Sequence, residues 1–216
     1  MTSAEQIGRA GRQAVGALVA RQTYKNLLYL FLAIPLGFLY YFTFGFGVLL
    51  GLLLTLVLVG VAILFVALLG ARLAAGLERW LANALLGLDL ERYGDVADAP
   101  GARSRLRAYV DAPSTWRAVG FLSMKTLVSV VALLGVIALA WIAELLLAPL
   151  RYPTDAEFGE LNGEPLVWTI ETVPEAALAG MLGTVLLVVF VHVANAIAYV
   201  CGRMSAALLG EPAIGR

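Results

Sequence analysis

Three polar side chains lie inside long apolar segments of the chain. Glu144 stands among tryptophan, isoleucine, alanine and leucine residues, and His192 precedes Asn195 by three positions. An ionisable group in a membrane span costs about 2.5 to 3.5 kcal/mol at the bilayer centre, so a functional role is the first hypothesis for such a residue. A carboxylate or an imidazole in that setting can relay protons, sense pH or contact an ion.

Each of these residues also has a structural interpretation. Arg151 follows Glu144 by seven positions, which puts both on one helix face and predicts an ion pair at the outer membrane boundary. His192 and Asn195 lie on nearly the same face, where polar side chains commonly form hydrogen bonds between membrane helices. Lys125, near the inner end of its span, is expected to extend its ammonium group to the headgroups.

Enzymatic chemistry finds no support in the sequence. There is one histidine and one cysteine, Cys201, so spacing predicts no metal site, no internal disulfide and no redox pair. No glycine-rich phosphate loop with lysine, no HExxH and no supported Ser/His/Asp set is present. We expect neither catalysis nor a cofactor.

The composition is that of an integral membrane protein. Of 216 residues, 61% are hydrophobic and 14% are charged, against about 25% charged in soluble domains. The apolar segments predict four helical spans, at about 26–44, 48–69, 119–147 and 174–199. The first two are divided at Gly45-Phe46-Gly47, where glycine permits a tight reversal. The fold class is therefore all-α and polytopic.

The basic residues predict the orientation. Fourteen of the fifteen arginines and lysines flank the same ends of the spans, and only Arg151 lies on the other side. Segments rich in these residues stay in the cytoplasm, so both termini are predicted to be cytoplasmic in a multi-pass protein of the cell membrane. The segment 151–172 becomes an acidic external loop. Zero net charge gives no reason to expect a nucleic-acid partner.

The chain contains an internal repeat. Thr-aromatic-basic triplets at 23–25 and 115–117 lie 92 residues apart, and Ala-Leu-Leu-Gly tetrapeptides at 84–87 and 207–210 lie 123 apart. Each copy has an even number of spans, which predicts two helical hairpins related as parallel repeats. The second copy is 31 residues longer, mainly through its external loop.

The repeat sets the predicted organisation of the chain. An N-terminal segment, 1–25, includes a candidate amphipathic helix at 7–20. Repeat 1 covers 26–88, a cytoplasmic linker 89–114, repeat 2 115–210 and a tail 211–216. The spans of both repeats are predicted to continue as cytoplasmic helical segments, at 71–88 and 194–209, whose small residues permit contact between repeats or with another chain, including a second copy.

Several motifs resemble the prokaryotic putative sensor membrane domain family over about 22–210. They are Thr-Tyr-Lys at 23–25, Leu-Tyr-Leu at 28–30, Pro-Leu-Gly at 35–37, Leu-Glu-Arg at 77–79 and Ala-Leu-Leu-Gly at 84–87. The resemblance implies a four-span domain that often precedes a histidine kinase. Repeat 2 departs from it, with Leu127 and Ser129 where repeat 1 has Pro35 and Gly37. No kinase follows Gly210, so a separate partner is expected to carry the signal.

Three functions are consistent with these features. The first is a non-enzymatic membrane sensor or accessory subunit, in which the bilayer or the exterior supplies a signal that passes to a separate signalling or transporter chain. The second is a small transporter or permease subunit with a pathway near Glu144 and His192, which the low intramembrane polarity disfavours. The third is a structural membrane scaffold.

Overall fold

Four long helices dominate the structure, a computed structural model that describes residues 16, 18–57, 59–95 and 102–210. All four are long and apolar enough to cross a membrane: Arg21–Val57, Val59–Leu86, Pro113–Arg151 and Val173–Leu209. The predicted all-α, multi-pass membrane fold is thus confirmed. Most of the candidate amphipathic helix at 7–20, and the tail 211–216, lie outside the described residues.

The first hairpin reverses later than the sequence predicted. Helix α2 (Arg21–Tyr40) continues through the π-helical segment η1 (Tyr41–Gly45) into α3 (Phe46–Leu53) and the 3-10 turn η2 (Leu54–Val57). The predicted reversal at Gly45-Phe46-Gly47 is therefore wrong. Gly45 has an ordinary helical φ of −60°, and the π-helical segment that ends there passes into α3 without a break in the helix.

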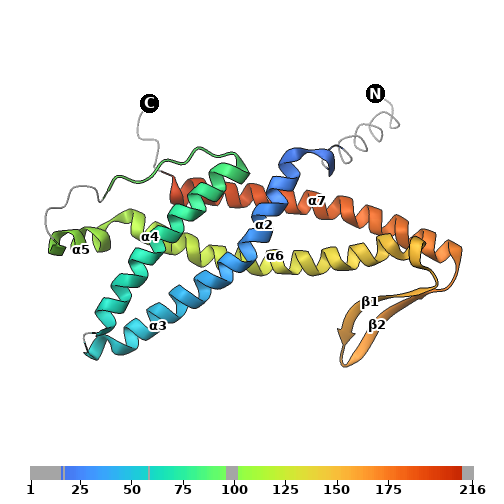
Figure 1. Cartoon of the computed structure of the whole chain (residues 1–216), viewed down its shortest axis with the longest axis horizontal. Coiled ribbons are helices and arrows are strands. Elements are labelled where there is room, and N and C mark those ends of the chain that lie inside the picture. Colours follow the sequence, from blue (N-terminus) through green and yellow to red (C-terminus); the bar gives the residue numbers. More distant parts are fainter. Residues whose placement is uncertain (1–15, 17, 58, 96–101, 211–216) are drawn as a thin grey trace. The chain divides into compact units, whose positions relative to one another are not determined.

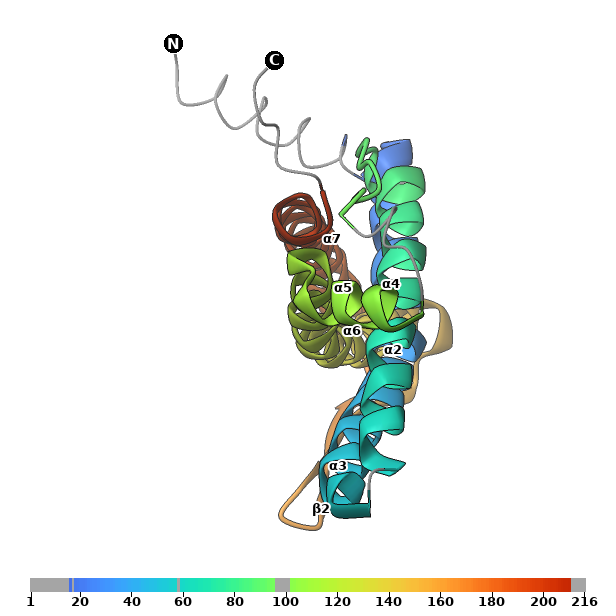
Figure 2. The same cartoon turned by 90° about the vertical axis from the view of Figure 1, so that its left-hand side faces the viewer.

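Close packing of glycines explains where the chain does reverse. Helix α4 (Val59–Leu86) returns alongside α3, as Figures 1 and 2 both show. A Cβ atom on Gly60 would overlap the carbonyl oxygen of Gly51. The glycine that the reversal needs is thus required for close backbone approach, and not for a positive φ.

Helix α4 ends at the first Ala-Leu-Leu-Gly tetrapeptide. Gly87 follows the last helical residue, Leu86, with a φ of +71°, the left-handed conformation that favours glycine at a helix C-terminus. Helix α7 (Val173–Leu209) likewise ends immediately before Gly210. The predicted continuation at 194–209 is helical throughout, whereas the one at 71–88 is helical only as far as Leu86. The segment 89–114 contains a short helix, α5 (Ala102–Asp111).

An antiparallel β-hairpin connects the last two long helices. Strands β1 (Thr154–Leu161) and β2 (Glu164–Ile170) project between the end of α6 (Pro113–Arg151) and the start of α7 (Figure 1). Asn162 and Gly163, with φ of 56° and 85°, form the two-residue turn, and register shifts between Glu157 and Glu160. The acidic loop predicted at 151–172 is therefore an ordered hairpin.

The chain forms two compact units. One unit consists of the described residues of Lys25–Ala132 and Ile197–Arg216, and we call it the ion-pair unit because it contains an ion pair between Lys125 and Glu78. The other consists of the described residues of Met1–Tyr24 and Leu133–Ala196, and we call it the hairpin unit. In the ion-pair unit the core is built around Tyr40, Phe121 and Leu209. In the hairpin unit Ile170 and Ala156, from the two strands, pack against Leu145 and Ala176.

Candidate functional site

A buried ion pair lies at the centre of the ion-pair unit. The Nζ atom of Lys125, on α6, is 2.8 Å from Oε2 of Glu78, on α4, and neither side chain has any exposed surface. Burying two charges is expensive, and removing one partner from such a pair costs about 3–5 kcal/mol because the other charge is left unpaired. Lys125 does not extend to the headgroups, so that prediction is wrong.

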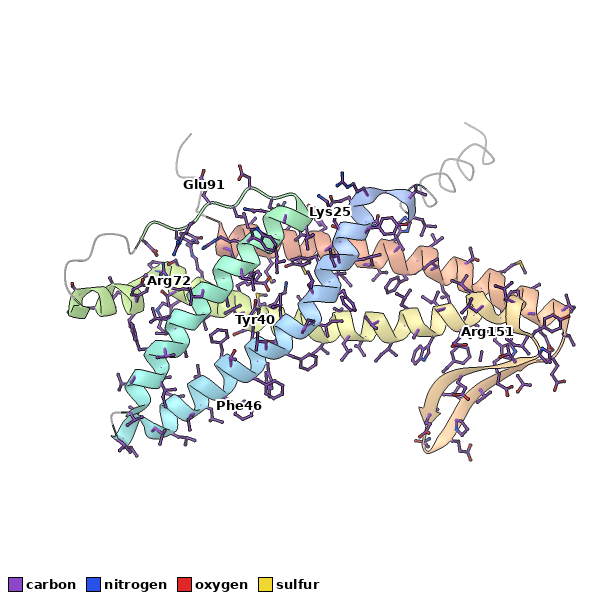
Figure 3. The ribbon with its side chains drawn as sticks, in the orientation of Figure 1. Lys25, Tyr40, Phe46, Arg72, Glu91 and Arg151 are labelled. Carbon is purple, nitrogen blue, oxygen red and sulfur yellow. The ribbon has the colours of Figure 1, made fainter. Side chains whose placement is uncertain are left out.

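Two tyrosines from α2 complete the surroundings of the ion pair. The hydroxyl of Tyr40 donates to Oε1 of Glu78 over 3.1 Å, so both carboxylate oxygens of Glu78 have a partner. The Nζ atom of Lys125 lies 3.9 Å from the ring centroid of Tyr29, in cation–π geometry. Figure 3 shows Tyr40 on α2 where this helix passes α4. The pair therefore connects α2, α4 and α6.

Two buried hydroxyl groups, one on α2 and one on α7, lack a hydrogen bond of normal geometry among the described residues. They are the hydroxyls of Tyr29 and Ser205. Cys201, one turn before Ser205, is also buried. A buried polar group without a hydrogen bond is costly in a low-dielectric environment.

Sequence reasoning missed Glu78 and Lys125 as a site. In the sequence, Glu78 stands within the Leu-Glu-Arg motif, and the position of Lys125 near a helix end favours contact of its ammonium group with the headgroups. The available signal was one acid and one base on two different apolar helices. Only the packing of α4 against α6 shows that they meet.

A second polar network lies where α5 joins α6. Arg72 donates hydrogen bonds to the hydroxyls of Ser114 and Thr115 over 2.7 and 2.9 Å, and it forms an ion pair with Asp95. Burial alone would raise the pKa of Asp95, but hydrogen bonds from Ser114 and Arg72 outweigh this effect and hold the pKa below its ordinary value. Figure 3 shows Arg72 on α4 near this junction.

The basic residue of each repeat's opening triplet is linked to the tetrapeptide that ends the same repeat. Lys25 donates to the carbonyl of Ala84 over 3.5 Å. Arg117 donates over 2.9 Å to the hydroxyl of Tyr93, which in turn donates to the carbonyl of Gly210. Cations near the final carbonyls of a helix are favourable, because those groups carry partial negative charge. The repeat marks thus fix where α4 and α7 end.

Glu144 lies at the surface of the hairpin unit. Its Oε2 atom is 3.8 Å from Nη1 of Arg151, and the two side chains are 45% and 57% exposed, so the predicted ion pair is present. Glu144 also lines a cleft with Asp155 and Glu157 of β1. Within the described residues no group of histidine, cysteine and acidic side chains has metal-binding geometry. A functional role for Glu144 stays a prediction.

His192 and Asn195 form hydrogen bonds to different partners. The Nδ1–H group of His192 donates to the carbonyl of Val188, on its own helix, over 2.8 Å, and the ring is exposed. Asn195 instead donates from Nδ2 to the hydroxyl of Thr23 over 3.1 Å. Asn195 therefore forms the predicted kind of contact between helices. A functional role for either residue stays a prediction.

These features define a multi-pass helical membrane protein with a buried charge pair at the crossing of three helices. A family described as "Putative sensor" matches residues 13–209, and the chain belongs to that family. The family assignment suggested by the sequence motifs is confirmed, and it supports a sensor role. No curated protein and no solved structure gives a significant match.

Proposed function

We propose that this chain is a non-enzymatic membrane sensor or accessory subunit that passes a membrane or external signal to a separate protein chain. Membership of the sensor family supports the sensor role. The observation that carries the mechanism is the fully buried pair of Lys125 and Glu78. We further propose a location in the cell membrane with both termini in the cytoplasm, as the basic residues predict.

The ion pair provides a physical basis for signal transfer. It joins α4 to α6, and Tyr40 extends the connection to α2. A movement of α4 along α6 must separate or re-pair these charges, so intermediate positions are unfavourable and two discrete arrangements are preferred. A stimulus shifts the balance only if it binds the two arrangements with different free energies. The C-terminal end of α4 would then carry the change to a partner.

Copurification tests whether such a partner exists. Full-length protein with an affinity tag, extracted in a mild detergent, should retain a kinase or a transcriptional regulator in stoichiometric amount. Absence of any stoichiometric partner would overturn the proposal. An ATPase subunit would favour transport instead.

The role of the ion pair needs a variant that keeps the fold. In Glu78→Gln/Lys125→Met both charges are removed, and the glutamine still offers an acceptor to Tyr40. This variant should bind the partner as the wild type does while changing its output. Arg203→Met removes an exposed basic residue of α7 that lies outside the ion pair and serves as the matched control. Unchanged output in the double variant would show that the pair is only structural.

The same pair favours transport as a second candidate. Ionisable residues in membrane helices mark substrate and ion pathways, and Lys125 and Glu78 add two to the few that the spans contain. Proteoliposomes separate the two candidates. A proton or cation flux that Glu78→Gln/Lys125→Met abolishes would establish transport, whereas lack of flux together with a signalling partner supports sensing. Glu144→Gln and His192→Ala, assayed alongside, test whether the predicted roles of those two residues exist.

A further inference from the structure

A cleft in the ion-pair unit carries an excess of positive charge. It has a volume of about 190 Å³, and three arginines line it: Arg72 and Arg79 from α4 and Arg92 from the segment that follows. Of these, Arg72 forms an ion pair with Asp95. Among the described residues no ion pair is formed by Arg79 or Arg92. Like charges that share a cleft repel one another unless an anion is bound.

The side chains around the arginines suit a phosphate group. All three arginine side chains line the same cleft, and the charges of Arg92 and Arg72 both act on Arg79. Guanidinium groups bind phosphate oxygens through paired hydrogen bonds, which makes arginine the preferred residue for planar, bidentate recognition. The hydroxyl-bearing side chains of Tyr93, Tyr109 and Ser114 line the same cleft.

The rest of the cleft is largely apolar, and part of this wall is exposed. Leu69, Leu73 and Leu208 line it, and Leu73 is 75% exposed. Sites for whole drug-sized ligands have volumes of about 300–1,000 Å³, so this cleft suits a headgroup phosphate more than a complete nucleotide. Basic pockets between membrane helices are known to bind anionic headgroups. The exposed Leu73 would contact the acyl chains.

We propose that Arg72, Arg79 and Arg92 form a binding site for the phosphate of an anionic phospholipid. This site is independent of the proposed signalling role, because a scaffold without a partner would keep it. A lipid headgroup and a soluble phosphate would both be bound by guanidinium groups through phosphate oxygens. The apolar wall of the cleft favours the lipid.

Native mass spectrometry of the full-length protein in a neutral detergent tests this site. Palmitoyl-oleoyl phosphatidylglycerol is titrated against the zwitterionic phosphatidylcholine with the same acyl chains. The wild type should retain the anionic lipid preferentially. Arg79→Gln/Arg92→Gln should weaken this binding about tenfold, because two charge-assisted contacts are lost. Arg203→Gln, which removes an exposed arginine of α7, should bind as the wild type does.

Three outcomes would overturn the proposal. They are equal affinity for the two lipids, unchanged phosphatidylglycerol binding by the double glutamine variant, and binding of inorganic phosphate as tight as that of the lipid. The last would assign the cleft to a soluble anion. If the glutamine variant does not fold, Arg79→Lys/Arg92→Lys keeps the charge but loses the bidentate geometry, and it should show a smaller loss of lipid binding in the same titration.

Discussion

The side-chain amide of Asn195 donates a hydrogen bond to the hydroxyl of Thr23, and the internal repeat contains the equivalent bond elsewhere. The offset of 92 residues pairs Thr23 with Thr115, and the offset of 123 pairs Arg72 with Asn195. Arg72 donates to Thr115 over 2.9 Å, and Asn195 donates to Thr23 over 3.1 Å. In each case the first helix of one repeat is bonded to the second helix of the other. Asn195 therefore belongs to one of two equivalent hydrogen bonds, Asn195–Thr23 and Arg72–Thr115, which we call the clamps.

Loss of either clamp should destabilise the protein, to different degrees. Thr23→Val and Asn195→Leu should each lower stability modestly, with a coupling of about 0.6 kcal/mol, as is typical of hydrogen bonds between membrane helices. Thr115→Val should cost more, about 1.5–3 kcal/mol, because its donor is charged. Double-mutant cycles, with unfolding by denaturant in detergent, measure the coupling free energy of each hydrogen bond. Thr184→Val, which removes only a bond to its own helix, should be nearly neutral; equal losses at all three threonines would contradict the clamp.

The buried ion pair predicts a strongly non-additive pair of substitutions. Lys125→Met should destabilise the protein by about 3–5 kcal/mol, since Glu78 then remains buried and charged. Adding Glu78→Gln should recover part of that loss, because no unpaired charge is left and Tyr40 keeps an acceptor. Equilibrium unfolding of the single and double variants provides the test. A double variant less stable than Lys125→Met alone would show that the charges are not paired in the folded protein.

Gly37 and Ser129 are equivalent residues of the two repeats and lie against each other. A Cβ atom on Gly37 would overlap the Cβ and Oγ atoms of Ser129, and the backbone of Lys125 is also close. Gly37→Ala should therefore destabilise the protein by about 1–3 kcal/mol, the usual cost of overpacking. The exchange Gly37→Ala/Ser129→Gly should restore much of the loss, because the crowded atom is removed from the other side.

A control for this prediction lies on α6. Gly120 is exposed within that helix, and a Cβ atom there would meet nothing within 4 Å. Gly120→Ala should be neutral or stabilising by up to about 1 kcal/mol, from helix propensity alone. Thermal unfolding of the wild type and these three variants in one detergent separates crowding from helix propensity. If Gly37→Ala behaves as Gly120→Ala does, the close contact between the repeats is absent.

The fold followed from the sequence where a single segment determined its own structure. Four spans and the helix ends at the two tetrapeptides depend on local apolar length and on terminal glycine, and both were predicted. The hairpin at 154–170 was not predicted, although Asn162-Gly163 between alternating residues is a strong turn signal. A polar segment between two spans also fits an irregular loop, so the turn signal does not by itself predict a hairpin.

The site could not be predicted in the same way, because it depends on which helices are neighbours. Lys125 alone resembles a lysine that extends to the headgroups, and Glu78 alone resembles an interfacial acid. Only the packing of α4 against α6 brings their charged atoms within 2.8 Å. The predicted position of the first reversal was wrong for a related reason. Gly51 and Gly60 are required by a contact between two helices, and not by a local turn.

Asp95 predicts a defined response to acid. Its folded-state pKa is below the ordinary value of 3.8, because hydrogen bonds from Ser114 and Arg72 to the carboxylate outweigh the effect of burial. The stabilisation from this group is therefore fully present above about pH 4, near the ordinary pKa of aspartate, and is lost as pH falls below that value. Asp95→Asn should lower stability at pH 7 and remove this part of the acid dependence. Melting temperatures of both proteins from pH 7 to pH 3 supply the measurement, and parallel curves would contradict it.

The proposed orientation predicts which residues a membrane-impermeant thiol reagent can reach. The only native cysteine, Cys201, is buried and should give little background, so single cysteines can be introduced in the wild-type chain. Glu160, on the exposed face of β1, should react from outside intact cells when changed to cysteine, because fourteen of fifteen basic residues lie at the opposite ends of the spans. Ser104→Cys, on the exposed part of α5, should react only after the membrane is permeabilised. The reverse pattern would invert the topology and would place the acidic hairpin, with Glu144, in the cytoplasm.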